Sequence, residues 1–136
     1  MNKVLRWYLW LAGLAMAAAF VGQAFIPEAV SHGTTWGAAP GWQREIAFWN
    51  VAMMTAITMA LRSRSDELAR VVATSVVVLG VALGTNHAAA FLAGARSGLP
   101  LFGAAGGTLV HASGAAVNYA GALLGAYGLA AGRAAR

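Results

Sequence analysis

Four long apolar stretches with almost no charged residue constrain this chain more than any other feature of its sequence. Crossing the roughly 30 Å hydrocarbon core of a bilayer takes about 20 helical residues. Hydrophobic residues make up 60% of the chain and charged residues 10%, whereas a soluble domain has about 25% charged residues. The mean hydropathy is +0.66. We therefore expect four membrane-spanning helices, at about residues 4–26, 43–61, 68–94 and 104–131.

The short connections between these stretches favour an all-α, antiparallel up-down bundle, a single membrane domain over residues 1–136. The basic residues indicate its orientation, because cytoplasmic loops are enriched in Lys and Arg. Arg44 and Arg96 fall on one side, and the others fall on the opposite side: Lys3, Arg6, Arg62, Arg64, Arg70, Arg133 and Arg136. Both termini are then cytoplasmic. Since these charges are scattered at helix ends, the pI near 10.8 favours contact with anionic lipid and disfavours nucleic-acid binding.

The first stretch also has features of a cleaved signal peptide. It has a basic start at Lys3 and Arg6 and small residues at Gly22 and Ala24, which fit a cleavage site. Its apolar run is longer than a typical signal core, so we expect the segment to be retained as the first span.

Two of the predicted spans carry a face of small residues that is interrupted by a histidine. Spacings of four and three place residues on one helix face, and in the fourth span this face comprises Gly107, His111, Gly114, Asn118, Gly121, Gly125, Gly128 and Gly132. The third span repeats the spacing in Gly80, Gly84, His87, Phe91 and Gly94. Such faces allow another backbone or a flat group to approach closely. At about 1.5 Å per residue, both histidines lie roughly 10 Å below the outer surface, so they can face each other.

Several interpretations of the facing histidines remain open. His87 and His111 could be axial ligands of a haem, or they could hold a divalent metal completed by Glu45, His32 or asparagines. They could also line a pocket for a small molecule of the quinone type. The alternative is purely structural, with close helix packing and hydrogen bonds across the bundle. The absence of cysteine excludes disulfides and thiolate metal sites.

Polar residues elsewhere gather in the outer half of the predicted bundle. Glu28 and His32 are placed at the outer mouth. We expect an outward-facing pocket in the outer leaflet, walled by the second, third and fourth spans and lined by His87, His111, Asn118, Asn86, Asn50, Glu45 and Arg44. Polar and ionisable residues within a membrane are candidates for a functional site. The alternative for Arg44 and Glu45 is an interfacial ion pair in an aromatic belt with Trp42 and Trp49.

The stretch GWQREIAFWNVAMMTAITMAL, followed by a basic turn, a third span and an intramembrane histidine, resembles a group of small bacterial four-helix integral membrane proteins over residues 41–92. In span count, length and a carboxylate near the start of the second span, the chain is also similar in architecture to the DoxX-type family. The resemblance implies a multi-pass protein of the bacterial inner (plasma) membrane, and it implies no particular activity or site residue.

These observations predict a binding or accessory subunit, whose outward-facing pocket receives a small ligand or a partner helix, rather than an enzyme. The chain has no phosphate-binding loop, HExxH motif or nucleophile elbow, and four spans leave no room for a soluble catalytic domain. We expect membrane lipid and a homo-oligomer or a larger membrane complex as partners. The alternatives are a haem- or metal-binding redox protein that uses His87 and His111, and a small transporter or channel that forms as a homo-oligomer.

Overall fold

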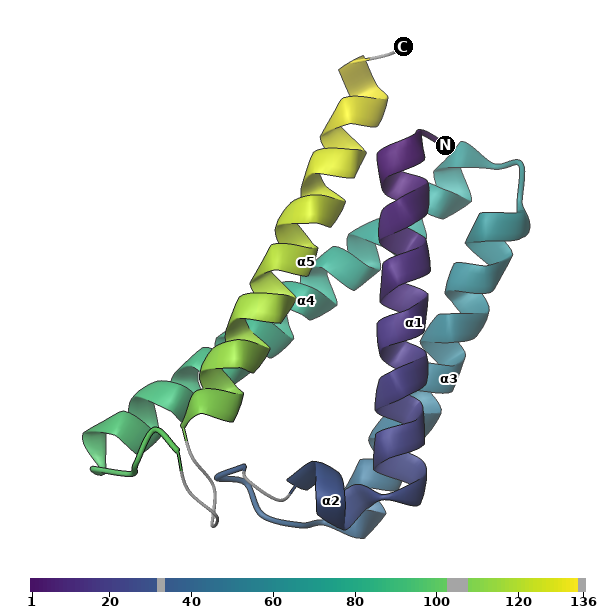
Figure 1. Cartoon of the computed structure of the whole chain (residues 1–136). Coiled ribbons are helices and arrows are strands. Elements are labelled where there is room, and N and C mark those ends of the chain that lie inside the picture. Colours follow the sequence, from purple (N-terminus) through teal and green to yellow (C-terminus); the bar gives the residue numbers. More distant parts are fainter. Residues whose placement is uncertain (32–33, 103–107, 135–136) are drawn as a thin grey trace.

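The computed structural model of the chain describes residues 1–31, 34–102 and 108–134, with side chains up to residue 132. Over these residues all regular secondary structure is helical, as predicted: α1 (Lys3–Phe25), α2 (Pro27–Ser31), α3 (Pro40–Arg62), α4 (Asp66–Arg96) and α5 (Leu109–Ala134) (Figure 1). The four long helices coincide with the predicted stretches to within a few residues. The predicted start of the fourth, near residue 104, lies outside the described residues.

The ends of α4 follow directly from local sequence. Ser65 Oγ accepts a hydrogen bond from the backbone N–H of Leu68 at 3.2 Å, and Asp66 and Glu67 occupy the first turn, where the helix dipole favours carboxylates. Beyond the last turn, Gly98 has a φ of +72°, a conformation that ends helices and favours glycine. Both signals are readable in the sequence.

The segment between α1 and α3 is only partly a loop. It begins with the short helix α2, whose first position is Pro27, a residue well suited to that position. Ser31 Oγ donates a hydrogen bond to Glu28 O at 3.0 Å within this turn. The chain then passes through residues 34–39, which we call the strap, to the start of α3 at Pro40.

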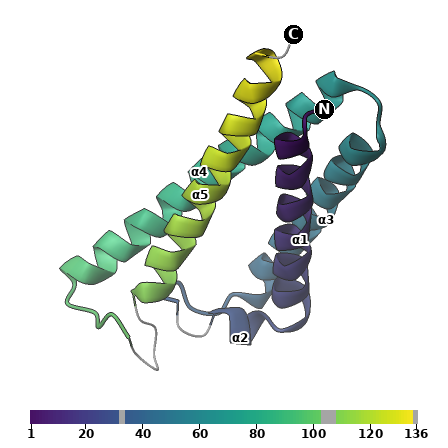
Figure 2. The same ribbon diagram turned by 45° about the horizontal axis from the view of Figure 1, so that its top comes forward.

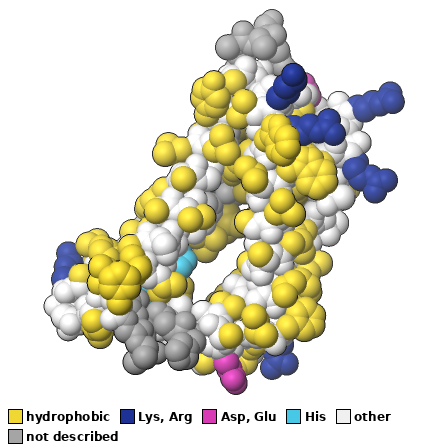
Figure 3. Space-filling model, viewed as in Figure 1, with side chains coloured by type: hydrophobic (Ala, Val, Ile, Leu, Met, Phe, Trp, Pro, Cys, Tyr) yellow, Lys and Arg dark blue, Asp and Glu magenta, His cyan; other side chains and the backbone are white. Residues whose placement is uncertain are grey.

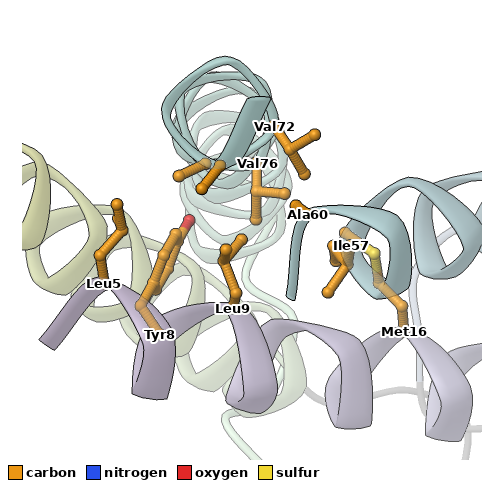
Figure 4. Packing of buried hydrophobic residues seen from close by; sticks show 10 residues of the cluster. Leu5, Tyr8, Leu9, Met16, Ile57, Ala60, Val72 and Val76 are labelled. Carbon is orange, nitrogen blue, oxygen red and sulfur yellow. The ribbon is translucent and has the colours of Figure 1, made fainter. Parts of the chain in front are cut away.

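A cluster of buried apolar side chains holds α1, α3 and α4 together (Figure 4). Its members are Leu5, Tyr8, Leu9, Met16, Ile57, Ala60, Ala69, Val72, Ala73 and Val76. These residues come from the first two-thirds of α1, the end of α3 and the start of α4. The cluster therefore lies toward the end of the molecule that carries both chain termini, which we call the terminal end (Figure 1).

The long helices form two pairs that meet at the terminal end and diverge toward the other. Successive long helices run in opposite directions, with α1 packed along α3 and α4 packed along α5 (Figures 1 and 2). Contact between the pairs is mainly between α1 and α5 and, less extensively, between α3 and α4, while α3 and α5 do not touch within the described residues. The strap lies at the diverging end, which we call the strap end.

The molecule is consequently more open than a compact domain of its size. Its accessible surface is 8450 Å², against about 6700 Å² expected for a compact folded monomer of this mass. The space-filling view shows a hollow between the two helix pairs, with a histidine side chain at its edge (Figure 3). Large apolar side chains are widely exposed, among them Trp7, Trp49, Val117 and Leu123. An apolar, open surface of this kind suits a lipid environment better than water.

Two helices in the described part of the chain are long and apolar enough to cross a membrane, α1 and α4. The other two long helices, α3 and α5, are not among these candidates. In α3 the polar residues include Gln43, Asn50 and two threonines, and in α5 His111 and Asn118 accompany many glycines and alanines.

Candidate functional site

The structure brings the two predicted histidines into direct contact. His87 on α4 and His111 on α5 approach through their Nδ1 atoms, which are 3.3 Å apart, within hydrogen-bonding distance. His111 has no exposed surface, while His87 is partly exposed. Matching spacings on two adjacent antiparallel helices place the imidazoles at one level, as the sequence predicts.

The partners of His111 determine which nitrogens carry protons. The backbone N–H of Thr35 lies 3.1 Å from His111 Nε2, and an N–H can only donate, so Nε2 is the unprotonated nitrogen. Thr35 Oγ1 also lies 2.9 Å from Nε2. In a neutral imidazole the proton then resides on Nδ1, which donates to His87 Nδ1. His87 in turn carries its proton on Nε2, for which the described residues provide no acceptor, so Nε2–H is a donor at the end of this chain of hydrogen bonds.

Trp36 covers both imidazoles from the strap. Its ring centroid is 4.6 Å from that of His111 and 4.9 Å from that of His87, at tilted angles typical of aromatic contacts. Trp36 remains 51% exposed. The strap, which connects the α1–α3 pair, thus binds to the α4–α5 pair through Thr35 and Trp36 and closes the strap end.

Glycine makes room for the histidine pair. A Cβ built on Gly114 would lie 2.6–2.8 Å from three atoms of the His87 ring, closer than real Cβ atoms approach other atoms. The glycines of the third-span face lie against α5 and the residue before it: Gly80 meets the backbone of Asn118, Gly84 meets the ring of Tyr119 and Gly94 meets Thr108. The two small-residue faces meet each other at Gly80, which lies against Asn118, and at Gly114, which lies against His87.

The face of α5 changes partner along its length. Gly125 contacts Tyr8, and Gly128 contacts the backbone of Leu5, both on α1. Gly121, one turn from Gly125 toward the strap end, has nothing within 4 Å. The small-residue face therefore has open space beside it at this position, whereas α1 covers it at Gly125 and Gly128.

The remaining predicted residues on α4 and α5 are near the pair but serve other contacts. Asn118 Nδ2 donates to Gly114 O of its own helix at 2.8 Å. Asn86 is on an exposed side of α4. Two residues before His87 on α4, the hydroxyl of Thr85 lies 3.0 Å from that of Tyr119, a polar contact that the sequence does not single out.

The structure does not bring the predicted residues of α3 to the histidines. Asn50 Nδ2 donates to Gln23 Oε1 of α1 at 2.9 Å. Arg44 Nε donates to Pro40 O at 3.3 Å at an exposed position, and Glu45 is also exposed. The physical reason is that α3 packs on α1 and does not reach α5 in the described part of the chain.

The geometry does not fit a haem between the histidines. Axial ligands lie on opposite faces of the macrocycle, whereas these imidazoles are in direct hydrogen-bonding contact and the His87 ring fills the space beside Gly114. For a metal ion, the described residues offer no group of three or more His, Cys, Asp or Glu side chains. His32, a predicted metal ligand, lies outside the described residues. Glu28, also placed at the mouth, is exposed on α2.

Sequence reasoning did not identify Thr35 and Trp36 as site residues. The sequence places both in a polar, aromatic loop, and only the pairing of a loop N–H with a buried imidazole nitrogen reveals their role. In comparisons with known proteins, no family model, curated protein or solved structure matches the chain.

Proposed function

We propose that this chain is a four-span protein of the bacterial inner membrane, with cytoplasmic termini, that binds a small ligand at the His87–His111 pair in the outer leaflet as an accessory subunit. The observation that carries the proposal is the contact between the two imidazoles under Trp36, on helices without charged residues nearby. Histidines at this depth are costly and commonly functional.

Helix length and charge distribution support four spans. The shortest of the long helices has 23 residues, which makes it about 35 Å long, enough for the hydrocarbon core. No Asp, Glu, Lys or Arg occurs in residues 7–27, 46–61, 71–95 or 97–132. Lys and Arg side chains gather at the terminal end (Figure 3), the pattern of a cytoplasmic face.

The exposed hydroxyl groups support the same conclusion for α3, which is too polar to qualify by hydropathy alone. In hydrocarbon a hydroxyl must find its partner within the protein, and serine and threonine do so by bonding to the carbonyl one turn earlier. Four exposed hydroxyls do this at 2.8–3.1 Å: Thr55 and Thr58 on α3, and Ser75 and Thr85 on α4.

Cysteine labelling in intact cells tests the topology, and the chain has no native cysteine. Ser63→Cys lies between α3 and α4, and Ser97→Cys lies after α4. A membrane-impermeant maleimide should label Ser97→Cys in intact cells and Ser63→Cys only after permeabilisation. Equal labelling of both positions in intact cells would contradict the four-span topology.

The binding role is tested by native mass spectrometry after purification in mild detergent. The wild-type chain should retain a bound small molecule, and His87→Phe should lose most of it, because phenylalanine keeps a ring against Gly114 but removes both nitrogens. Leu123→Phe, on an exposed face of α5, is the matched control and should retain the ligand. A wild-type protein that is a lone monomer with no adduct would end the proposal.

A further inference from the structure

The hollow between the helix pairs is bounded by contacts between the pairs at both ends, and we call this boundary the frame. At the terminal end α1 packs into α5 at Gly125 and Gly128. At the strap end Thr35 and Trp36 bind to the histidine pair. Between these contacts, a Cβ built on Gly121 would meet no neighbouring atom of the described residues within 4 Å. The space-filling view shows a hollow between the two helix pairs (Figure 3).

Hydrocarbon is the expected content of this frame. If the chain spans the membrane, as proposed above, the hollow lies at the depth of the lipid tails. Empty space there forfeits dispersion contacts, and water is not stable in a space with few polar groups. The stretches of α1, α4 and α5 that border the frame contain no Asp, Glu, Lys or Arg. An occupant therefore needs an apolar chain and no net charge.

The strap end of the frame adds two requirements for the polar part of the occupant. The hydrogen-bond chain from Thr35 leaves His87 Nε2–H as a donor, which calls for an acceptor such as a carbonyl oxygen. Trp36 is half exposed beside it, which favours a flat ring that can stack. Gly114, against which His87 packs, and Gly121 are seven residues apart, so the donor and the open hollow are separated by about 10 Å along α5.

From these features we propose that the ligand of the His87–His111 site is a membrane quinone, an uncharged ring with carbonyl oxygens that carries a long hydrocarbon chain. The ring accepts a hydrogen bond from His87 Nε2 and stacks on the exposed side of Trp36. The chain runs from there past Gly121 into the hollow. This inference rests on the proposed binding function and adds the chemical class of the ligand and the place of its tail.

Competing occupants fit these requirements less well. A phospholipid brings a charged or zwitterionic headgroup to a frame without charged side chains. A helix of a second copy would fill the hollow but would leave the donor of His87 facing an apolar surface, because intramembrane helices keep their carbonyls in their own backbone hydrogen bonds. Both occupants predict that an added quinone does not bind at Trp36.

Quenching of tryptophan fluorescence by decylubiquinone tests the proposal directly. Trp7, Trp10, Trp42 and Trp49 are at least half exposed, so phenylalanine is tolerated there and Trp36 can be made the single tryptophan. In detergent, Trp36 fluorescence should be quenched saturably. A matched variant that keeps only Trp49, on an exposed face of α3, should show the weak, linear quenching of quinone dissolved in the micelle.

Two substitutions in the Trp36-only protein locate the ring and the chain. A Cβ at Gly121 meets no neighbouring atom within 4 Å, so we expect Gly121→Phe to place its ring in the hollow and to weaken quinone binding at least tenfold, whereas Leu123→Phe on the exposed face should leave binding unchanged. His87→Phe should weaken binding about tenfold through loss of one hydrogen bond. Thermal unfolding of each variant shows whether the fold is retained, and His87→Gln is the second variant if His87→Phe does not fold.

The outcomes separate this inference from the proposed function. Saturable quenching of Trp36 that is weakened by both substitutions supports both. Linear quenching that is equal for Trp36 and Trp49, or binding that Gly121→Phe leaves unchanged, overturns the quinone proposal. In that case a bound molecule in native mass spectra that His87→Phe removes would still support a ligand at the histidine pair, but of another class.

Discussion

The two halves of the small-residue face on α5 have the same spacing but different surroundings. Toward the terminal end, Tyr8 and Leu5 of α1 pack against Gly125 and Gly128, so glycine there allows close helix packing. Toward the strap end, the His87 imidazole packs against Gly114, and Gly121 faces open space. A periodic pattern of glycine therefore indicates close approach, but what approaches depends on where the neighbouring helix leads.

We expect the largest effect on the free energy of unfolding when leucine replaces a glycine in the half of the face that packs against α1. A Cβ at Gly125 would be 2.5 Å from both the Tyr8 ring and Val77, so we predict that Gly125→Leu lowers the free energy of unfolding by about 3 kcal/mol, the upper range for overpacking. Gly121→Leu, one turn away, should change it by less than about 0.5 kcal/mol, as for a substitution without special contacts. Reversible unfolding in detergent measures both. Equal destabilisation by the two leucines would mean that the halves do not differ.

A smaller loss is expected when the fully buried imidazole of the strap end is removed. His111→Ala leaves the Thr35 N–H and His87 Nδ1 without their partner, and we predict a loss of about 2 kcal/mol for these unsatisfied groups. The strap should also detach from the α4–α5 pair. Spin labels at Ala38→Cys and Ser97→Cys, read by pulsed electron resonance, should give one narrow distance in the wild type and a broad distribution in His111→Ala. A narrow, unchanged distance would show that the strap is held by other contacts.

The smallest effect is expected for the hydroxyl of the strap. Thr35→Val keeps the backbone N–H that bonds to His111 but removes Oγ1, which lies 2.9 Å from the same nitrogen. We predict a loss of about 1 kcal/mol, one ordinary hydrogen bond, with the spin-label distance still narrow. Thr55→Val, whose hydroxyl bonds only to a carbonyl of its own helix among the contacts described, is the control and should be close to neutral. A detached strap in Thr35→Val would assign the main contact to the hydroxyl.

The sequence predicts the helices well because their causes are local. Long apolar stretches, the Ser65 cap and Gly98 determine where α4 begins and ends. The meeting of His87 and His111 is also predictable, since two equal spacings on adjacent antiparallel helices place them at one level.

The rest depends on tertiary contacts that no local pattern contains. Asn50 has the polarity of a pocket residue, but it pairs with Gln23 because α3 packs on α1. The role of Thr35 comes from a backbone N–H, which every residue except proline has. The helix pairs diverge because α1 packs against only some of the glycines of α5. The spacing of these glycines alone does not specify which helix packs against each of them.

The hydrogen bond between the Nδ1 atoms of His87 and His111 can be detected by nitrogen NMR of the histidine side chains in lipid bilayers. Replacing His32 with Gln leaves only the two imidazoles in the spectrum. The structure predicts a nitrogen–nitrogen correlation between a protonated Nδ1 of His111 and an unprotonated Nδ1 of His87, which Gly114→Ala abolishes by displacing the His87 ring. Two uncoupled imidazoles, both protonated on Nε2 and exchanging freely with solvent, would show that this hydrogen bond does not form.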